Sequence, residues 1–87
     1  MYLILVYDIN VERTTKILKL CRKYLNHIQN SVFEGEITES NFSEFKLKIN
    51  EIIDKTQDSI IIFRLWDNKY YKKEIIGFEK NSCENLI

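Results

Sequence analysis

The amino-terminal part of the chain is an unbroken apolar run that stops at an acidic residue. Residues 2–7 are all aliphatic or aromatic, and Asp8 follows them directly. A second run, residues 59–66, is also mostly apolar and carries Arg64 as its only charge. Runs without polar alternation are typical of β-strands that are buried on both faces. The fold must therefore cover both faces of the sheet that contains these two strands.

The segment after Asp8 changes from a strand pattern to a helical one and back. Apolar residues recur at helical spacing over residues 12–25, and Asn10 is a suitable cap for that helix. Residues 28–37 are typical of two short strands or of one bent strand, and the sequence leaves both open. Gly35 within this segment indicates a bulge or a close approach of the backbone.

A second helix and a last strand complete the pattern. Thr38 or Asn41 caps the helix, which precedes the second apolar run. A charged loop then leads to a short strand at residues 74–78. The order β-α-β-β-α-β with one extra strand predicts an α+β, ferredoxin-like plait. We therefore expect one domain, residues 1–78, and a polar C-terminal tail, residues 79–87.

In such a plait both helices cover one sheet face, which leaves the other face open. Because residues 2–7 do not alternate with polar residues, something must cover that open face. The simplest cover is the same face of a second copy, which predicts a sheet-to-sheet homodimer. We expect the extra strand at 74–78 to pair with the sheet edge of that partner.

Charge is unevenly distributed although the chain is neutral overall. Its 13 basic and 13 acidic residues give a net charge of zero. The segment 10–30 nevertheless contains five basic residues and one acid, and a second basic cluster follows residue 66. A local positive field attracts phosphates whatever the total charge is. These lysines and arginines predict either a nucleic-acid-binding surface or an ordinary solvated helix face.

The composition bears on where the protein works. No segment approaches the roughly 20 apolar residues that a membrane span requires. The first residues lack the basic segment and cleavage site of a signal peptide. Cys21 and Cys83 are too few and too far apart for a disulfide framework or a zinc motif. We expect a cytoplasmic protein without membrane contact, with Cys21 in the core.

Asp8 stands at the end of the first strand, at the boundary between core and solvent. On position alone it either fixes the following turn or acts in chemistry. In a two-fold dimer joined through its sheets, the two Asp8 carboxylates would approach each other. A Mg²⁺ ion shared between them would relieve their repulsion and serve phosphodiester hydrolysis. The sequence contains no Ser/His/Asp or Cys/His set for covalent catalysis.

Two short motifs resemble a known family. The first is Leu-Val-Tyr-Asp-Ile at residues 5–9 with Arg13 behind it. The second is the block Gln-x-Ser-Val-Phe-Glu-Gly at residues 29–35, set within 27–38. Together, at this spacing and chain length, they resemble the CRISPR-associated protein two family, and the likeness runs from Met1 to about residue 78.

The resemblance implies a fold, an assembly and an activity. It implies a ferredoxin-like homodimer in which Asp8 of each protomer binds one shared Mg²⁺. Family members resemble metal-dependent endonucleases of single-stranded RNA, and in some cases of double-stranded DNA. They also resemble the central nucleic-acid-binding dimer of the complex that captures spacers in antiviral defence. On this basis we expect an adaptation-stage endonuclease whose partners are the CRISPR integrase and RNA or double-stranded DNA.

Site residues follow from the motifs and the basic clusters. Asp8 is expected to be both catalytic residue and metal ligand. The residues that we expect to bind nucleic acid are Arg13, Lys16, His27, Ser31, Phe33, Lys69 and Lys72. Some members have an arginine in place of His27, and others a second arginine near Thr15, which leaves the strength of the nuclease activity open.

Three alternatives remain at this point. The first is a DNA-binding scaffold without catalytic activity of its own. The second is a toxin ribonuclease similar to the virulence-associated protein D family, against which the block at residues 29–35 argues. The third is an RNA-recognition plait, but such a module needs exposed aromatic residues within a Gly-rich strand motif, which this sequence lacks.

Overall fold

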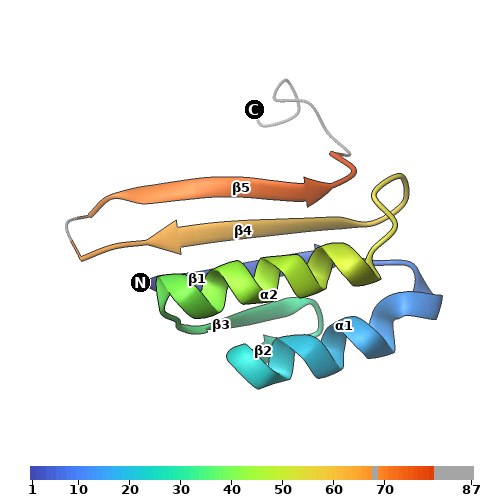
Figure 1. The fold of residues 1–87 in the computed structure, drawn as a ribbon, viewed down its shortest axis with the longest axis horizontal. Coiled ribbons are helices and arrows are strands. Elements are labelled where there is room, and N and C mark those ends of the chain that lie inside the picture. Colours follow the sequence, from blue (N-terminus) through green and yellow to red (C-terminus); the bar gives the residue numbers. More distant parts are fainter. Residues whose placement is uncertain (68, 80–87) are drawn as a thin grey trace.

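The computed structural model describes residues 1–67 and 69–79. Its elements are β1 (Tyr2–Asp8), α1 (Val11–Tyr24), β2 (Asn26–Gln29), β3 (Val32–Glu36), α2 (Glu39–Ile52), β4 (Ser59–Leu65) and β5 (Tyr71–Gly77). The strands form one antiparallel sheet in the order β2-β3-β1-β4-β5, and both helices lie on the same face of it (Figure 1). The predicted α+β, ferredoxin-like order with one extra strand is confirmed.

The segment between the helices forms two strands rather than one bent strand. β2 pairs with β3, and the register shifts between His27 and Gln29, which is where the irregularity of this hairpin lies. Gly35 pairs regularly with Leu3 of β1, so of the two alternatives at this glycine, a bulge or a close backbone approach, the bulge is wrong. A Cβ at Gly35 would lie 3.4 Å from the Leu25 side chain, which is an ordinary contact.

The helices are held to the sheet by apolar faces at helical spacing. The buried residues of α1 are Ile17, Leu20 and Cys21, and those of α2 are Phe42, Phe45 and Ile49. The rings of Tyr24 and Phe45 stack at 4.7 Å between centroids and so connect the two helices directly. The core therefore lies in a single layer between the helices and one sheet face, and Cys21 belongs to it as expected.

The two helix starts are built differently. Thr38 caps α2, because its Oγ1 accepts a hydrogen bond of 3.0 Å from the backbone N–H of Asn41. Asn10 occupies the cap position of α1, but its side chain makes no capping hydrogen bond. Instead its Nδ2 donates to Oε1 of Gln57, in the loop after α2. The start of α1 is thus tied to a distant loop.

β5 is longer than expected and is paired within its own chain. It begins at Tyr71 rather than at residue 74, and it runs alongside β4 from Leu65 to Ser59. Pairing with β4 uses one edge of β5, and β5 is the outermost strand of the sheet, so pairing of its other edge with a partner stays a prediction. Its end requires glycine: Gly77 has φ +97, and a Cβ there would lie 2.3 Å from the carbonyl oxygen of Asp58.

The described part of the chain ends at Glu79. The predicted tail, residues 79–87, and with it Cys83, lies outside the described residues apart from Glu79 itself. Over residues 1–67 and 69–79, none of the helices is long and apolar enough to cross a membrane.

Candidate functional site

The sheet face opposite the helices is apolar at its centre. Side chains of β1 alternate, so that Leu3, Leu5 and Tyr7 lie under the helices while Ile4 and Val6 lie on the open face. The cross-strand register adds further half-buried apolar residues to that face: Val32, Ile61, Phe63, Leu65 and Ile75. A single chain therefore exposes a sheet face that is apolar at its centre, as the non-alternating runs predict, with Glu34 and Lys73 beside that centre.

Asp8 lies at one end of this open face. It has the same strand parity as Ile4 and Val6, and its side chain is exposed. Its partner across the sheet is Ser59, which forms the last pair between β1 and β4. A carboxylate in this place combines a rigid strand backbone with solvent access, and its oxygens are the ligand type that Mg²⁺ prefers.

One chain does not supply a metal cage by itself. Within residues 1–67 and 69–79, no three His, Cys, Asp or Glu side chains are grouped so that they could hold a metal ion. Asp8 fits Mg²⁺ in the chemistry of its donor atoms, but one carboxylate is a weak site. Further ligands have to come from water, from a substrate phosphate or from a second chain.

The turn between β2 and β3 lies beside the end of β1. The backbone N–H of Tyr7 donates to the carbonyl of Ser31 at 3.0 Å, and the Tyr7 hydroxyl donates to the carbonyl of Asn30 at 2.8 Å. Residues 29–32 line a shallow depression at this turn. The structure thus brings Ser31, one of the predicted nucleic-acid-binding residues, to the end of the sheet that carries Asp8.

His27 and Phe33 lie on the helix side of the sheet, away from the open face. Phe33 is fully buried, and it pairs with Leu5 on one side and with His27 on the other. The His27 ring stacks on the Phe33 ring at 4.5 Å with an interplanar angle of 11°. Its Nε2 lies 3.2 Å from the carbonyl oxygen of Asn30. His27 is exposed at the sheet edge, and its inner ring face packs against the buried ring of Phe33.

Arg13 is held by an acidic residue that is 45 positions away in the sequence. Its Nε lies 2.5 Å from Oδ2 of Asp58, and its Nη2 lies 3.0 Å from Oδ1 of the same carboxylate. The Asp58 side chain is fully buried, and that of Arg13 is 17% exposed. The guanidinium thus binds the carboxylate in a bidentate way, which is a strong type of ion pair. A second acid, Glu12, lies 3.1 Å from Nη1 of Arg13.

Asp58 is the important residue that sequence reasoning missed. In the sequence it is part of a polar connection, Thr56 to Asp58, and nothing local distinguishes it from a turn residue. Its partner Arg13 is 45 positions away, so no short motif contains both. The only available signal was an arginine in the first turn of α1, where the helix dipole favours acids instead.

The Arg13–Asp58 pair makes the free energy of unfolding depend on pH. The Arg13 hydrogen bond lowers the pKa of Asp58 from 3.8 to about 2, while burial opposes this shift. Below pH about 4 the unfolded chain takes up this proton and the folded chain does not, so stability is lost as the pH falls toward 2. We expect a contribution of about 2 kcal/mol, complete above pH about 5. Urea unfolding at a series of pH values measures it. An Asp58→Asn variant with the parent's acid dependence would contradict the assignment.

Lys16 lies one helical turn beyond Arg13 and is exposed. It lines a groove between α1 and α2 together with other basic side chains: Lys19, Lys23 and Lys48. Leu20 and Ile52 also line this groove, and Glu51 is the one acidic residue along it. The groove therefore presents four lysines and one acidic residue along the two helices.

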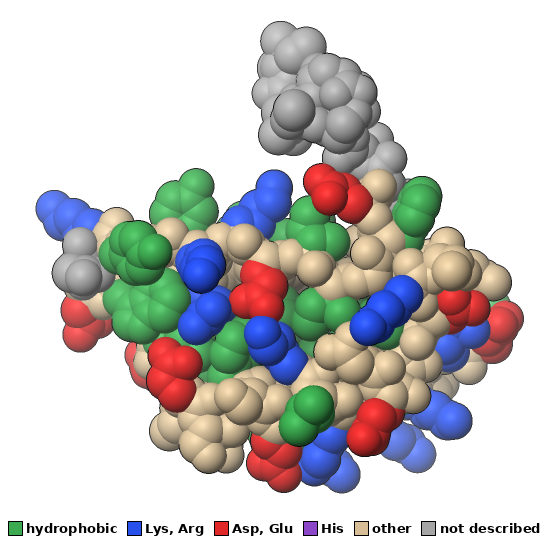
Figure 2. Space-filling model, turned by 45° about the horizontal axis from the view of Figure 1, so that its top comes forward, with side chains coloured by type: hydrophobic (Ala, Val, Ile, Leu, Met, Phe, Trp, Pro, Cys, Tyr) green, Lys and Arg blue, Asp and Glu red, His purple; other side chains and the backbone are tan. Residues whose placement is uncertain are grey.

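Lys69 and Lys72 lie at the opposite end of the sheet. β4 runs from Ser59, beside Asp8, to Leu65, beside Tyr2, and the loop that follows carries Lys69. Lys72 pairs with Arg64 across β4 and β5. The structure therefore separates the two predicted basic clusters by the length of the sheet. The face that contains α2 and the β5 edge shows acidic and basic side chains interspersed with apolar ones (Figure 2).

A network of ion pairs accounts for part of this mixed face. Glu74 of β5 lies 2.5 Å from Nζ of Lys46 and 3.3 Å from Nη1 of Arg64. The Arg64 guanidinium also lies over the rings of Phe42 and Trp66, at 4.9 and 5.1 Å from their centroids. These charges tie β5 to α2. Their geometry therefore explains Arg64, the one charge in the second apolar run, as a structural residue.

Known proteins with similar sequences and folds share one family. The family model described as CRISPR associated protein Cas2 matches residues 1–73. The CRISPR-associated endoribonuclease Cas2 of Methanocaldococcus jannaschii is 49% identical over all of this chain and 76% of its own length. The protein of the same name from Dictyoglomus turgidum is 47% identical over the full length of both.

A solved structure agrees with the sequence comparisons. The crystal structure of Streptococcus pyogenes Cas2 at pH 6.5 superposes with a TM-score of 0.70 at 36% identity, over 78% of this chain and 89% of that one. The family match covers both motifs around Asp8 and Ser31 and most of the sheet. This chain belongs to the Cas2 family of CRISPR-associated proteins.

Proposed function

We propose that this protein is a metal-dependent endoribonuclease that works as a homodimer, with one Asp8 from each chain at a shared Mg²⁺ site. The observation that carries the proposal is the position of Asp8 at the end of an apolar sheet face that has no cover within the described chain. The names of the relatives, which are CRISPR-associated endoribonucleases, support the nuclease activity.

The open face gives the physical reason for a dimer. A contiguous apolar surface of this kind marks an interaction site on a soluble protein. If the same face of a second copy covers it, the interface is isologous and residues near the axis meet their own equivalents. Asp8 then contributes a pair of carboxylates, and the two chains together offer what one chain lacks.

Each described residue near Asp8 has a distinct role in this proposal. The two Asp8 carboxylates would hold Mg²⁺, which proteins commonly bind through one or two carboxylates together with substrate phosphates. When bound, the cation supplies polarisation of the phosphodiester and a water nucleophile of lowered pKa. Ser31 is available at the neighbouring turn to bind the RNA backbone, and the exposed His27 lies on β2, on the helix side of the sheet. Lys16 adds positive charge on the helix side.

A charge placed in the open face tests the dimer and the activity together. Ile61→Glu adds a carboxylate between Val6 and Ile75, its two apolar cross-strand neighbours on this face. Burying two unpaired charges per dimer is costly, so we expect association to weaken by at least about 30-fold and Mg²⁺-dependent RNA cleavage to fall with it. Sedimentation equilibrium and an RNA cleavage assay measure both quantities.

The control for that experiment is Leu47→Glu. Leu47 lies on α2 and is 67% exposed, so the same change there leaves the open face intact. We expect this variant to associate and cleave as the parent does. An Ile61→Glu protein that remains dimeric at micromolar concentration and fully active would contradict the proposal.

A second function, nucleic-acid binding within the integrase complex, rests on the basic groove. Lys16, Lys19, Lys23 and Lys48 line one groove, and phosphate backbones bind to such surfaces by charge. We include in the proposal that the dimer binds double-stranded DNA for the CRISPR integrase during spacer capture, in the cytoplasm. Family membership supports this part as well.

Salt dependence tests the binding role separately from catalysis. We expect Lys16→Ala together with Lys19→Ala to weaken DNA binding and to reduce the slope of log affinity against log salt by about 1 to 2 for each chain. Fluorescence anisotropy at several salt concentrations measures the slope. The matched control is Lys55→Ala, at an exposed lysine away from this groove. Equal slopes in parent and double variant would rule out the groove as a phosphate-binding surface.

A further inference from the structure

The Asp8 carboxylate lies where regular structure ends. The β1–β4 ladder stops at the pair Asp8–Ser59, and the chain then turns through Ile9 and Asn10 into α1. A metal ligand at a strand end needs its backbone fixed, because small displacements of the ligand change its distance to the metal. The contacts that hold the turn after Asp8 therefore bear on any metal that it binds.

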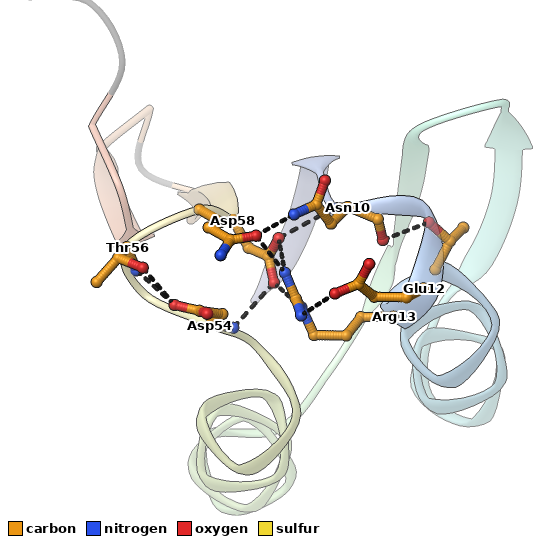
Figure 3. A network of polar contacts seen from close by, with 8 residues as sticks. Asn10, Glu12, Arg13, Asp54, Thr56 and Asp58 are labelled. Carbon is orange, nitrogen blue, oxygen red and sulfur yellow. Dashed lines mark hydrogen bonds and ion pairs between the residues drawn. The ribbon is translucent and has the colours of Figure 1, made fainter.

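Those contacts converge on the buried carboxylate of Asp58. Its Oδ1 accepts the backbone N–H of Asn10 at 2.9 Å, and its Oδ2 accepts the backbone N–H of Asp54 at 2.9 Å. The Arg13 guanidinium donates to both oxygens. Figure 3 shows Asp58 between the start of α1 and the loop after α2, with these contacts pointing inward from both sides. One side chain thus joins the start of α1 to the loop after α2.

Asp58 is itself fixed on the strand side. It comes directly before Ser59, the residue that pairs with Asp8. Its carbonyl accepts a hydrogen bond of 2.7 Å from the backbone N–H of Phe78, just past the end of β5. The close approach of Gly77 to this carbonyl leaves no room for a side chain. Asp58 therefore connects the ends of β1, β4 and β5 through covalent and hydrogen bonds.

We propose that Asp58, together with Arg13, is a positioning residue for the candidate metal site. The Asp58 carboxylate holds Asn10, two residues after Asp8, while its own backbone holds the strand opposite Asp8. These contacts fix the backbone in the turn after Asp8 and in the strand opposite it. They therefore hold the Asp8 carboxylate in one direction. This inference rests on the proposed function, since it assigns a role relative to a cation at Asp8.

The alternative is that the pair only stabilises the fold. A purely structural role would lower the unfolding temperature of a variant but leave metal affinity unchanged wherever the protein is folded. A positioning role predicts weaker metal binding in folded protein. Removing a group that orients a metal ligand typically lowers the metal affinity by about 10- to 100-fold.

The experiment measures Mn²⁺ affinity by calorimetry on full-length protein, at a temperature at which circular dichroism shows every variant to be folded. The variants are Asp58→Asn, which keeps the shape and removes the charge, and Arg13→Lys, which keeps the charge and removes the two-pronged geometry. Ile49→Ala is the matched control, because Ile49 is fully buried in α2 and its truncation destabilises the core without touching this network.

We expect the Mn²⁺ dissociation constant to rise about tenfold or more in Asp58→Asn, by a smaller factor in Arg13→Lys, and not at all in Ile49→Ala. The Mg²⁺ concentration for half-maximal RNA cleavage should rise in the same order, while KM for RNA stays close to that of the parent. If Asp58→Asn does not fold, Arg13→Lys decides the question, and an unchanged dissociation constant in that variant overturns the proposal.

The outcomes separate this inference from the proposed function. Asp58→Asn with the parent's Mn²⁺ affinity, while Asp8→Asn loses binding, overturns the positioning role alone. If Ile49→Ala weakens Mn²⁺ binding as much as Asp58→Asn does, the positioning role is also overturned, because general destabilisation would then explain the effect. Asp8→Asn with the parent's affinity, or a parent that binds no Mn²⁺, overturns the metal site and the positioning role together.

Discussion

Replacing Asp8 by asparagine is expected to lower Mg²⁺-dependent RNA cleavage by at least about 100-fold, because it removes the charge that holds the cation from both chains at once. Asparagine keeps the size of the side chain, and Asp8 is exposed at the end of β1. The free energy of unfolding should therefore change by no more than about 0.5 kcal/mol. Cleavage of single-stranded RNA with Mg²⁺ and with a chelator measures the effect.

Asp67→Asn is the matched control for this substitution. Asp67 is also exposed, but it follows β4 at the opposite end of the sheet. We expect the Asp67→Asn protein to cleave RNA at the parent's rate. An Asp8→Asn protein that retains full metal-dependent activity would remove the nuclease part of the proposal and leave only the nucleic-acid-binding role.

Replacing Arg13 by methionine is expected to destabilise the fold by about 3–5 kcal/mol, because it leaves the Asp58 carboxylate buried without its counter-charge. Asp58 is 0% exposed, and only the backbone N–H groups of Asn10 and Asp54 would still bind it. Methionine retains most of the packing volume of arginine, so the loss of unfolding free energy measures the effect of removing the charge. Urea unfolding followed by circular dichroism measures the difference.

Lys16→Met is the control for this measurement. Lys16 lies three residues after Arg13 on the same helix, and it is exposed. We expect its replacement to change the free energy of unfolding by no more than about 0.5 kcal/mol. Equal effects of the two substitutions would show that the Arg13–Asp58 pair adds nothing beyond an ordinary surface charge.

The contrast between Arg13 and Lys16 bears on how the motif residues are interpreted. Arg13 was expected to bind nucleic acid, yet its guanidinium is engaged by Asp58 and Glu12 within the chain. Phe33 was expected there as well and is fully buried beneath His27. Direct contact of Arg13 with nucleic acid stays a prediction, and any influence of the buried Phe33 would pass through His27. Ser31 is half-buried at the Asp8 end of the sheet, and Lys16 is exposed on α1.

The part of the fold that follows from local periodicity was predictable from the sequence. The apolar runs indicated the central strands, and the helical repeats placed Ile17 and Phe45 in the core. Strand parity was also informative: Asp8 is an even-numbered residue of β1, as Val6 is, and the structure places both on the open face.

Contacts between distant segments were not predictable in this way. Asp58 meets Arg13 only because the loop after α2 folds back on the start of α1, and no periodicity records that. β5 begins earlier than expected because Lys72 and Lys73 pair with β4 despite their charge. Charged residues are common on edge strands, where one side of the backbone stays in water.

The most direct test of the account is a crystal structure of the protein grown with Mn²⁺, with anomalous scattering used to locate the metal. The account predicts a dimer joined through the open sheet faces, with one Mn²⁺ peak on the two-fold axis between the Asp8 carboxylates. Mn²⁺ bound elsewhere, or a dimer in which the two Asp8 side chains lie too far apart to share an ion, would contradict it.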